Sequence, residues 1–282
     1  MKKEKSTQKV KVEQVFTRFS IVEPTNRRSI TPTMKTIENA FGKITVRSVY
    51  KLITRDIKIF LALATYIYTN KDMVEEAIVH DKKLLATTID LYDFVQNYLH
   101  KQPSKPVYDA VIDSLNVLIQ TYLEGEYFVK SDDGVESIQV RTSILPFTEI
   151  RTKKEKGQKG EKIVVDLFIF EWTLRMLTNP FPRSLFIDNY LLQQTNSSVA
   201  TLLCLFLMSQ PNATSYSKSF LIEQLGLQPL QENDNIDREL KKAFEELHKL
   251  GYIQSWHIEK RRDDTYYVFS RTKALPKPKK KK

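Results

Sequence analysis

The residues with the clearest chemical potential lie in one segment near the carboxyl end of the chain, Asn235–Leu250. Apolar residues recur there at helical spacing and form one stripe, namely Ile236, Leu240, Phe244, Leu247 and Leu250. The opposite face carries Arg238, Lys241, Lys242, Glu245 and Lys249. Cations on an exposed helix face can bind phosphates, and Arg and Asn side chains can also bond base edges. The segment therefore predicts contact with duplex DNA.

The predicted contacts divide by their position along this helix. In a recognition helix the amino-terminal turns reach base edges and the later residues meet the DNA backbone. The expected base readers are Asn233, Asn235, Arg238 and Lys242. The expected phosphate contacts are Lys241 and Lys249, with Lys218 adding a contact from the preceding short helix.

A short helix is expected before this segment and a β-hairpin after it. A short amphipathic helix is expected over Ser217–Gly226, and strands Tyr252–Glu259 and Thr265–Phe269 follow as a hairpin. The hairpin tip is cationic, with Lys260, Arg261 and Arg262, and Arg271 is expected to extend the cationic surface. Two helices and a basic β-wing are typical of DNA-binding winged-helix domains. The alternative is that such a face, like the terminal lysine run, serves solubility.

Composition sets bounds on function. The chain has 282 residues, a formal charge of +10 and 41% hydrophobic residues, which indicates folded cores and an anionic partner. The single cysteine, Cys204, excludes an intramolecular disulfide and is expected to be a buried thiol. The apolar run around it is too short to span a bilayer. Because Met1–Lys11 lacks the apolar stretch of a secretory signal, we expect a cytoplasmic protein without membrane contact.

Catalytic and cofactor motifs are missing from the sequence. There is no phosphate-binding Gly-x-x-x-x-Gly-Lys-Ser/Thr run, and a total of seven glycines argues against a nucleotide-binding loop. The four histidines are scattered, without the spacing of a metal site. We expect no enzyme activity, no cofactor and no metal.

The amino-terminal half shows a similar order of elements. Helices are expected over Thr54–Thr69, Asp90–Leu99 and Val107–Glu124, the last capped by Gly125. One hairpin joins Glu126–Lys130 to Ser137–Leu145, and a second joins Phe147–Arg151 to Lys162–Phe170. Residues 1 to 40 show no sustained period and are expected to form a flexible polar arm.

The two halves are expected to repeat one plan, with Tyr122–Phe128 at the same step as Leu247–Ile253. The predicted fold is α+β, with two tandem winged-helix domains over residues 41–178 and 179–272 and a lysine-rich tail over 273–282. The exposed face of Val107–Glu124 is acidic, at Asp109 and Asp113. The first domain is therefore expected either to meet the DNA backbone or to form a protein interface. The backbone contacts would come from Lys101, Lys105 and the loop that begins with Lys153 and Lys154.

This order of elements resembles the iteron-type plasmid replication initiators over about residues 44–270. Ser114–Tyr122, followed by strands and then Ser184–Leu192, is similar to that family's junction between its two domains. The resemblance implies binding of double-stranded DNA at origin repeats, self-repression, partnership with the host replication initiator and replicative helicase, and a homodimer through the first domain. A winged-helix transcriptional regulator and a protein-binding scaffold without DNA binding remain alternatives.

Overall fold

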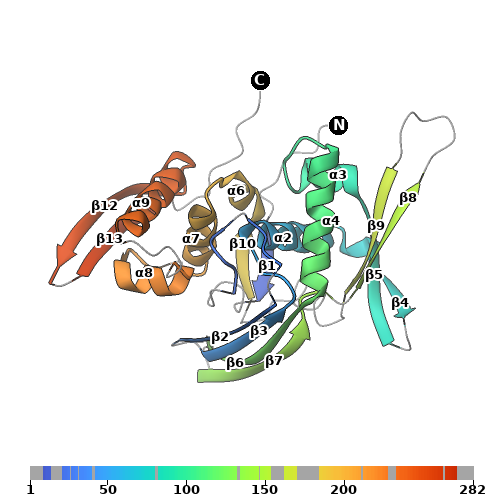
Figure 1. Cartoon of the computed structure of the whole chain (residues 1–282), viewed down its shortest axis with the longest axis horizontal. Helices are drawn as coiled ribbons and strands as arrows, with labels where there is room; N and C mark the ends of the chain where they lie inside the picture. The colour runs from blue at the N-terminus through green and yellow to red at the C-terminus, as the bar shows by residue number, and fades with distance from the viewer. Residues whose placement is uncertain are drawn as a thin grey trace.

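The structure is a computed structural model with mixed helices and sheets (Figure 1). It describes residues 9–13, 21–25, 27–30, 32–39, 42–79, 82–131, 134–145, 147–153, 162–169, 184–210, 212–227, 233–262 and 264–271. Lys154, the rest of its loop and the tail 273–282 lie outside these residues. Among the described helices, none combines the length and apolar character that a membrane crossing requires.

Helix α2, Thr54–Thr69, lies at the centre of the molecule and has the bounds that its apolar spacing predicted. The Asp56 carboxylate accepts the Ile53 backbone N–H at 2.9 Å, which satisfies one amide at the helix start. The helix packs against α4 (Lys105–Ile119), α6 (Asn189–Gln194) and α7 (Ser198–Met208).

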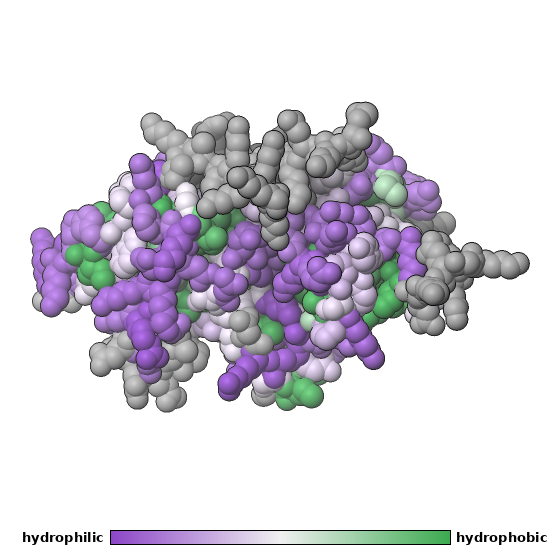
Figure 2. All heavy atoms as spheres, turned by 90° about the horizontal axis from the view of Figure 1, so that it is seen from above, coloured by the Kyte–Doolittle hydropathy of each residue, from purple (hydrophilic) through white to green (hydrophobic). Residues whose placement is uncertain are grey.

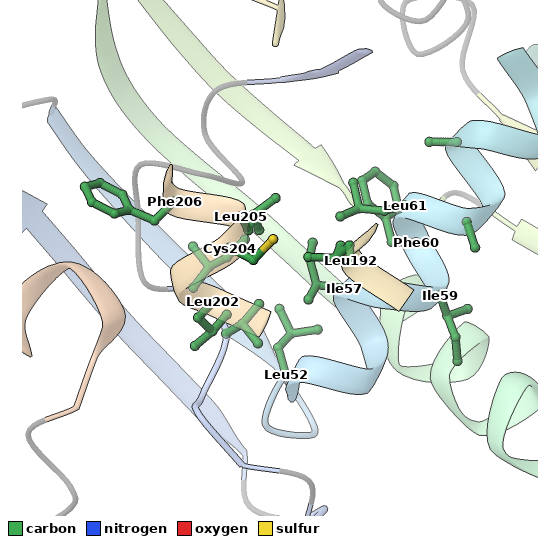
Figure 3. Close-up of a cluster of buried hydrophobic side chains, with 14 of the residues drawn as sticks. Leu52, Ile57, Ile59, Phe60, Leu61, Leu192, Leu202, Cys204, Leu205 and Phe206 are labelled. Carbon is green, nitrogen blue, oxygen red and sulfur yellow. The ribbon is translucent and has the colours of Figure 1, made fainter. Parts of the chain in front are cut away.

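The core is continuous between the two halves of the chain. Leu52 and Ile57 from the amino-terminal half face Leu192, Leu202 and Cys204 from the carboxyl-terminal half (Figure 3). Cys204 is fully buried, as expected, and burial raises the pKa of its thiol.

One four-stranded sheet has the order β2-β3-β6-β7 and is antiparallel throughout. Its strands are Thr33–Asn39, Gly42–Ser48, Thr121–Ser131 and Gly134–Ser143. The expectation that residues 1–40 form a flexible arm is wrong for three described parts, of which the first is strand β1, Lys9–Glu13. Thr33–Asn39 is a sheet strand, and Ile21 and Val22 are buried in the core.

Gly125 lies inside strand β6, so its predicted role as a helix cap is wrong. Helix α4 ends at Ile119, before the predicted end, and the chain continues directly as a strand. A Cβ at position 125 would lie 2.1 Å from the Lys43 carbonyl oxygen on β3. The glycine therefore permits close approach of two strands.

A second sheet has the order β4-β5-β9-β8. Its strands are Glu75–Val79, Lys82–Asp90, Lys162–Ile169 and Phe147–Lys153. Lys71–Met73 forms a short 3-10 helix before it, and helix α3, Leu91–Asn97, follows β5 directly. The Asp90 side chain accepts the Tyr92 backbone N–H at 3.0 Å and starts α3.

The carboxyl-terminal elements follow α7 in the predicted order. They are β11 (Ser215–Ser217), α8 (Lys218–Leu225), α9 (Asn233–Lys249), β12 (Ile253–Arg261) and β13 (Asp264–Arg271). Ser217 caps the start of α8, and left-handed Gly226 ends it. A separate two-stranded sheet pairs β1, Lys9–Glu13, with β10, Ser184–Asp188.

The two halves repeat one topology, but the elements that correspond between them are not the ones predicted. In each half the strand before the short helix pairs with the second strand of a hairpin, which gives the orders β5-β9-β8 and β11-β13-β12. The hairpin equivalent to β12–β13 is therefore β8–β9. The predicted match between Tyr122–Phe128 and Leu247–Ile253 is wrong, because β6 and β7 are inserted between α4 and that hairpin. There β6 pairs with β3, and β7 pairs with β6.

Candidate nucleic-acid interface

Helix α9 is held by its apolar face. Leu240, Phe244 and Leu247 are fully buried, and Ile236 is nearly so. The Phe244 ring stacks on Tyr267 of β13, with ring centroids 4.9 Å apart. These contacts fix the helix against the hairpin and turn its other face outward.

The outward face carries the predicted cations. The side chains of Arg238, Lys242 and Lys249 are 63%, 60% and 72% exposed, and Lys241 is exposed as well. Within the described residues, Lys241 has no carboxylate partner. Asn235 lies about one turn before Arg238 and is partly exposed. The side chain of Asn233, at the first residue of α9, lies outside what the structure describes.

Glu239 is a member of this face that the sequence interpretation did not select. Its Oε1 atom lies 3.1 Å from Lys242 Nζ and 3.8 Å from Arg238 Nε. Arg238 also donates to Asn235 Oδ1 at 2.9 Å. The i, i+3 spacing of Glu239 and Lys242 was visible in the sequence and could have indicated this contact.

Lys218 has a different environment from the other predicted contacts. It begins α8, its side chain is 17% exposed, and its ammonium lies 2.8 Å from Asp237 Oδ1 on α9. The side chain therefore joins the two helices and is largely covered.

The β12–β13 hairpin has cationic residues at its tip, where Lys260, Arg261 and Arg262 are exposed. Arg261 donates to Glu259 Oε2 at 2.6 Å, and its guanidinium lies 4.8 Å from the centroid of the Tyr266 ring. Hydrogen bonds from His257 and Arg261 lower the pKa of Glu259. Lys260 and Arg262 have no carboxylate partner among the described residues.

The start of the hairpin's second strand is tied to α8. The Ser219 hydroxyl donates to Asp264 Oδ2, and this bond is the main cause of the lowered pKa of Asp264. Two neighbouring residues of α8, Lys218 and Ser219, thus contact α9 and the hairpin respectively. The first turn of α8 sets the relative position of both.

Arg271 was expected to extend the cationic surface, but its side chain binds backbone carbonyl groups of the protein. Its guanidinium donates to the carbonyl oxygens of Leu207 and Ala213 at 2.6 and 2.7 Å. These carbonyl groups lie at the end of α7 and in the following loop, so Arg271 acts as a helix C-terminal partner.

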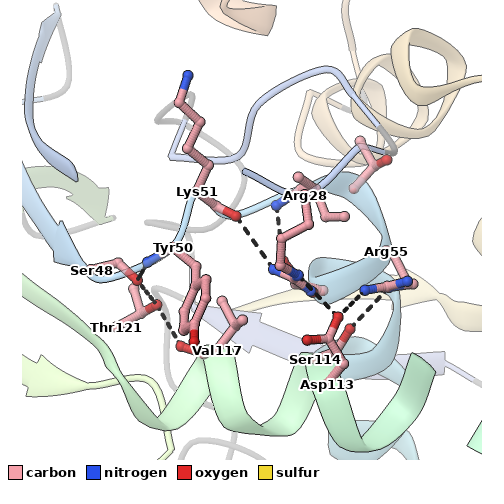
Figure 4. A network of polar contacts seen from close by, with 12 residues as sticks. Arg28, Ser48, Tyr50, Lys51, Arg55, Asp113, Ser114, Val117 and Thr121 are labelled. Carbon is pink, nitrogen blue, oxygen red and sulfur yellow. Dashed lines mark hydrogen bonds and ion pairs between the residues drawn. The ribbon is translucent and has the colours of Figure 1, made fainter. Parts of the chain in front are cut away.

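Helix α4, the counterpart of α9 in the first half, presents a different face. Asp109 is exposed, as predicted, but Asp113 is engaged in an ion-pair network (Figure 4). Arg28 Nε lies 3.0 Å from Asp113 Oδ2, and Arg55 pairs with the same oxygen. Arg28 also binds both oxygens of the buried Asp56, at 2.6 and 2.9 Å. The carboxylate of Asp113 therefore binds two arginines of its own chain.

The basic loop of the first half begins at the end of strand β8. Lys153 is the last residue of β8, and its side chain and all of Lys154 lie outside the described residues. Hydrophilic residues cover most of the described surface on the face shown in Figure 2, and hydrophobic residues form small separate patches.

Comparison with known proteins finds similarity at the level of the fold. No family model matches the sequence, and no curated protein matches it significantly. A crystal structure of domains 2 and 3 of RctB superposes with a TM-score of 0.58 and 16% identity, over 90% of this chain and 95% of that one. A second structure, of RctB residues 155–483, gives a TM-score of 0.56 and 15% identity over 89% and 95%. The chain thus has the fold of these RctB domains.

Proposed function

We propose that this protein binds double-stranded DNA in a sequence-specific manner and initiates replication at repeated sites of an origin. The observation that carries the proposal is the outward face of α9, where Arg238, Lys241, Lys242 and Lys249 are exposed on a helix fixed by its apolar side. Such a face fits the major groove, and the hairpin tip at Lys260–Arg262 lies at the end of an adjoining element.

The choice of replication over other DNA functions has separate support. RctB is a replication initiator of Vibrio chromosome II, and its domains 2 and 3 share this fold over most of both chains. We interpret both halves as winged-helix units, because each has three helices and a later hairpin in the same strand order, with β6 and β7 inserted before that hairpin in the first half. A host initiator, a replicative helicase and a second copy of this chain are the proposed protein partners.

The test begins with the DNA that flanks the gene. Footprinting with the full-length protein should protect direct repeats, and a plasmid carrying that region should replicate only when the protein is supplied. Protection of a promoter without replication would support a transcriptional regulator. No binding to any duplex would favour a protein-binding scaffold and reject the proposal.

A further inference from the structure

Helix α9 is not basic in net charge, although its exposed face is cationic. Its sequence contains four Lys or Arg residues and five carboxylates. A carboxylate close to DNA phosphates lowers affinity for every sequence. An acidic residue on a helix that binds DNA therefore lowers affinity unless its carboxylate has another role in the protein.

Two of these carboxylates have partners on other elements. Asp237 pairs with Lys218 of α8. Glu246 accepts the backbone N–H groups of Asn196 and Ser197, immediately before α7. Both side chains hold α9 in place, and neither binds a predicted base reader.

Glu239 binds the predicted base readers themselves. One oxygen, Oε1, lies 3.1 Å from Lys242 Nζ and 3.8 Å from Arg238 Nε. The Glu239 side chain is 28% exposed, which is less than half the exposure of either cation. Asn235 accepts a further bond from Arg238 at 2.9 Å. Both cations therefore contact Glu239 in the free protein, and Arg238 also contacts Asn235.

We propose that Glu239 determines specificity by competing with DNA for Arg238 and Lys242. This inference rests on the proposed DNA-binding function. A guanine in register offers Arg238 two acceptors in place of one carboxylate oxygen, whereas other bases do not. The contact with Glu239 therefore penalises non-cognate DNA more than the cognate site, and discrimination comes from the difference.

The test uses the full-length protein with Glu239→Gln, which keeps the shape and removes the charge. Two probes are needed: a duplex of random sequence, and one of the same length selected by the wild-type protein from a random pool. We expect affinity for the random duplex to rise about threefold to tenfold, with a salt slope steeper by about one. Affinity for the selected duplex should change less, so the ratio of the two affinities falls.

Glu245 provides the matched control, because it lies on the same helix and pairs with the predicted phosphate contact Lys249 at 3.4 Å. Glu245→Gln should raise both affinities equally and leave their ratio unchanged. In a protein that already carries Arg238→Ala and Lys242→Ala, Glu239→Gln should lose its effect on the ratio. Glu239→Asp keeps the charge and should restore much of the wild-type ratio.

Two outcomes overturn the inference. The first applies when the wild-type protein prefers the selected duplex. In that case, if Glu239→Gln leaves the ratio of the two affinities unchanged, or changes it only as much as Glu245→Gln does, Glu239 has no role in specificity. A wild-type protein that binds neither duplex, or both equally, would instead reject the proposed function and this inference with it. Thermal unfolding of each variant checks that the fold is intact.

Discussion

The ammonium of Lys218 lies 2.8 Å from Asp237 Oδ1 and joins the first turn of α8 to the first turns of α9. The Lys218 side chain is 17% exposed and that of Asp237 is 37% exposed, so water screens the pair only partly. The relationship makes Lys218 part of the support for α9.

Lys218→Ala should lower the free energy of unfolding by about 1–3 kcal/mol, because it leaves a partly buried carboxylate without its partner. Urea denaturation measures this change. Lys241→Ala, at an exposed position on α9, is the control and should change stability by less than about 0.5 kcal/mol. Equal stability of the two variants would contradict a supporting role for Lys218.

Arg28→Ala should be more damaging. The guanidinium of Arg28 binds the fully buried side chain of Asp56 and also reaches Asp113, so its removal leaves one buried charge without compensation. We expect a loss of about 3–5 kcal/mol in the free energy of unfolding, measured by denaturant titration. The neighbouring Arg27 is exposed, and Arg27→Ala should have little effect. A similar loss in both variants would show that the ion-pair network is not the cause.

Lys58 should make stability depend on pH. Burial, with a smaller contribution from Lys101, lowers the pKa of Lys58 from 10.5 to about 8, and its ammonium donates to the Thr195 carbonyl. Between these two values the unfolded chain binds more protons than the folded one, so stability from this group rises with pH from about 8 to 10.5. The gain is on the order of 3 kcal/mol.

Lys58→Met should remove that rise. Comparison of the unfolding free energies of wild type and variant from about pH 7 to 10.5 isolates the contribution from other groups that titrate there. Lys101→Met should bring the pKa of Lys58 closer to its usual value and weaken the dependence. Parallel pH profiles for wild type and Lys58→Met would contradict the assignment.

Arg238→Ala and Lys249→Ala should separate base reading from phosphate contact. Arg238 lies nearer the start of α9, and its loss should cost about 1–3 kcal/mol on the selected duplex and relax preference at one base pair. Lys249→Ala should weaken binding to selected and random duplexes alike and reduce the salt slope by about one. Fluorescence anisotropy over a salt series measures both. Equal effects on the two duplexes for both variants would reject the division of roles.

Elements with a strong local period could be predicted from the sequence. Helix α2 and the β8–β9 hairpin lie where the apolar spacing and the turn residues placed them. Strand β2 was missed because Thr33–Asn39 does not alternate between apolar and polar residues. Its half-buried positions are Thr33, Lys35 and Ile37, and only the last of these is apolar. The pairing of β1 with β10 joins Lys9–Glu13 to Ser184–Asp188, far apart in the sequence, and no local pattern can indicate that.

The candidate site shows the same division. The cationic face of α9 followed from helical spacing within one segment. The pairing of Lys218 with Asp237, and of Arg28 with Asp113, depends on how separate elements pack. The sequence therefore predicted an outward role for Lys218, and it did not indicate the arginine partners of Asp113. Gly125 was misplaced because a glycine after a helical stretch usually marks a cap, whereas here it allows close strand packing.

The shared core around α2 has a consequence for thermal denaturation. Thr54 Oγ1 lies 3.2 Å from Ser198 Oγ, and Gln193 donates to the Lys58 carbonyl at 2.9 Å, so polar bonds also cross between the halves. Melting one half would expose apolar surface of the other. Heat should therefore unfold the chain in a single cooperative transition, in which the calorimetric enthalpy equals the van't Hoff enthalpy.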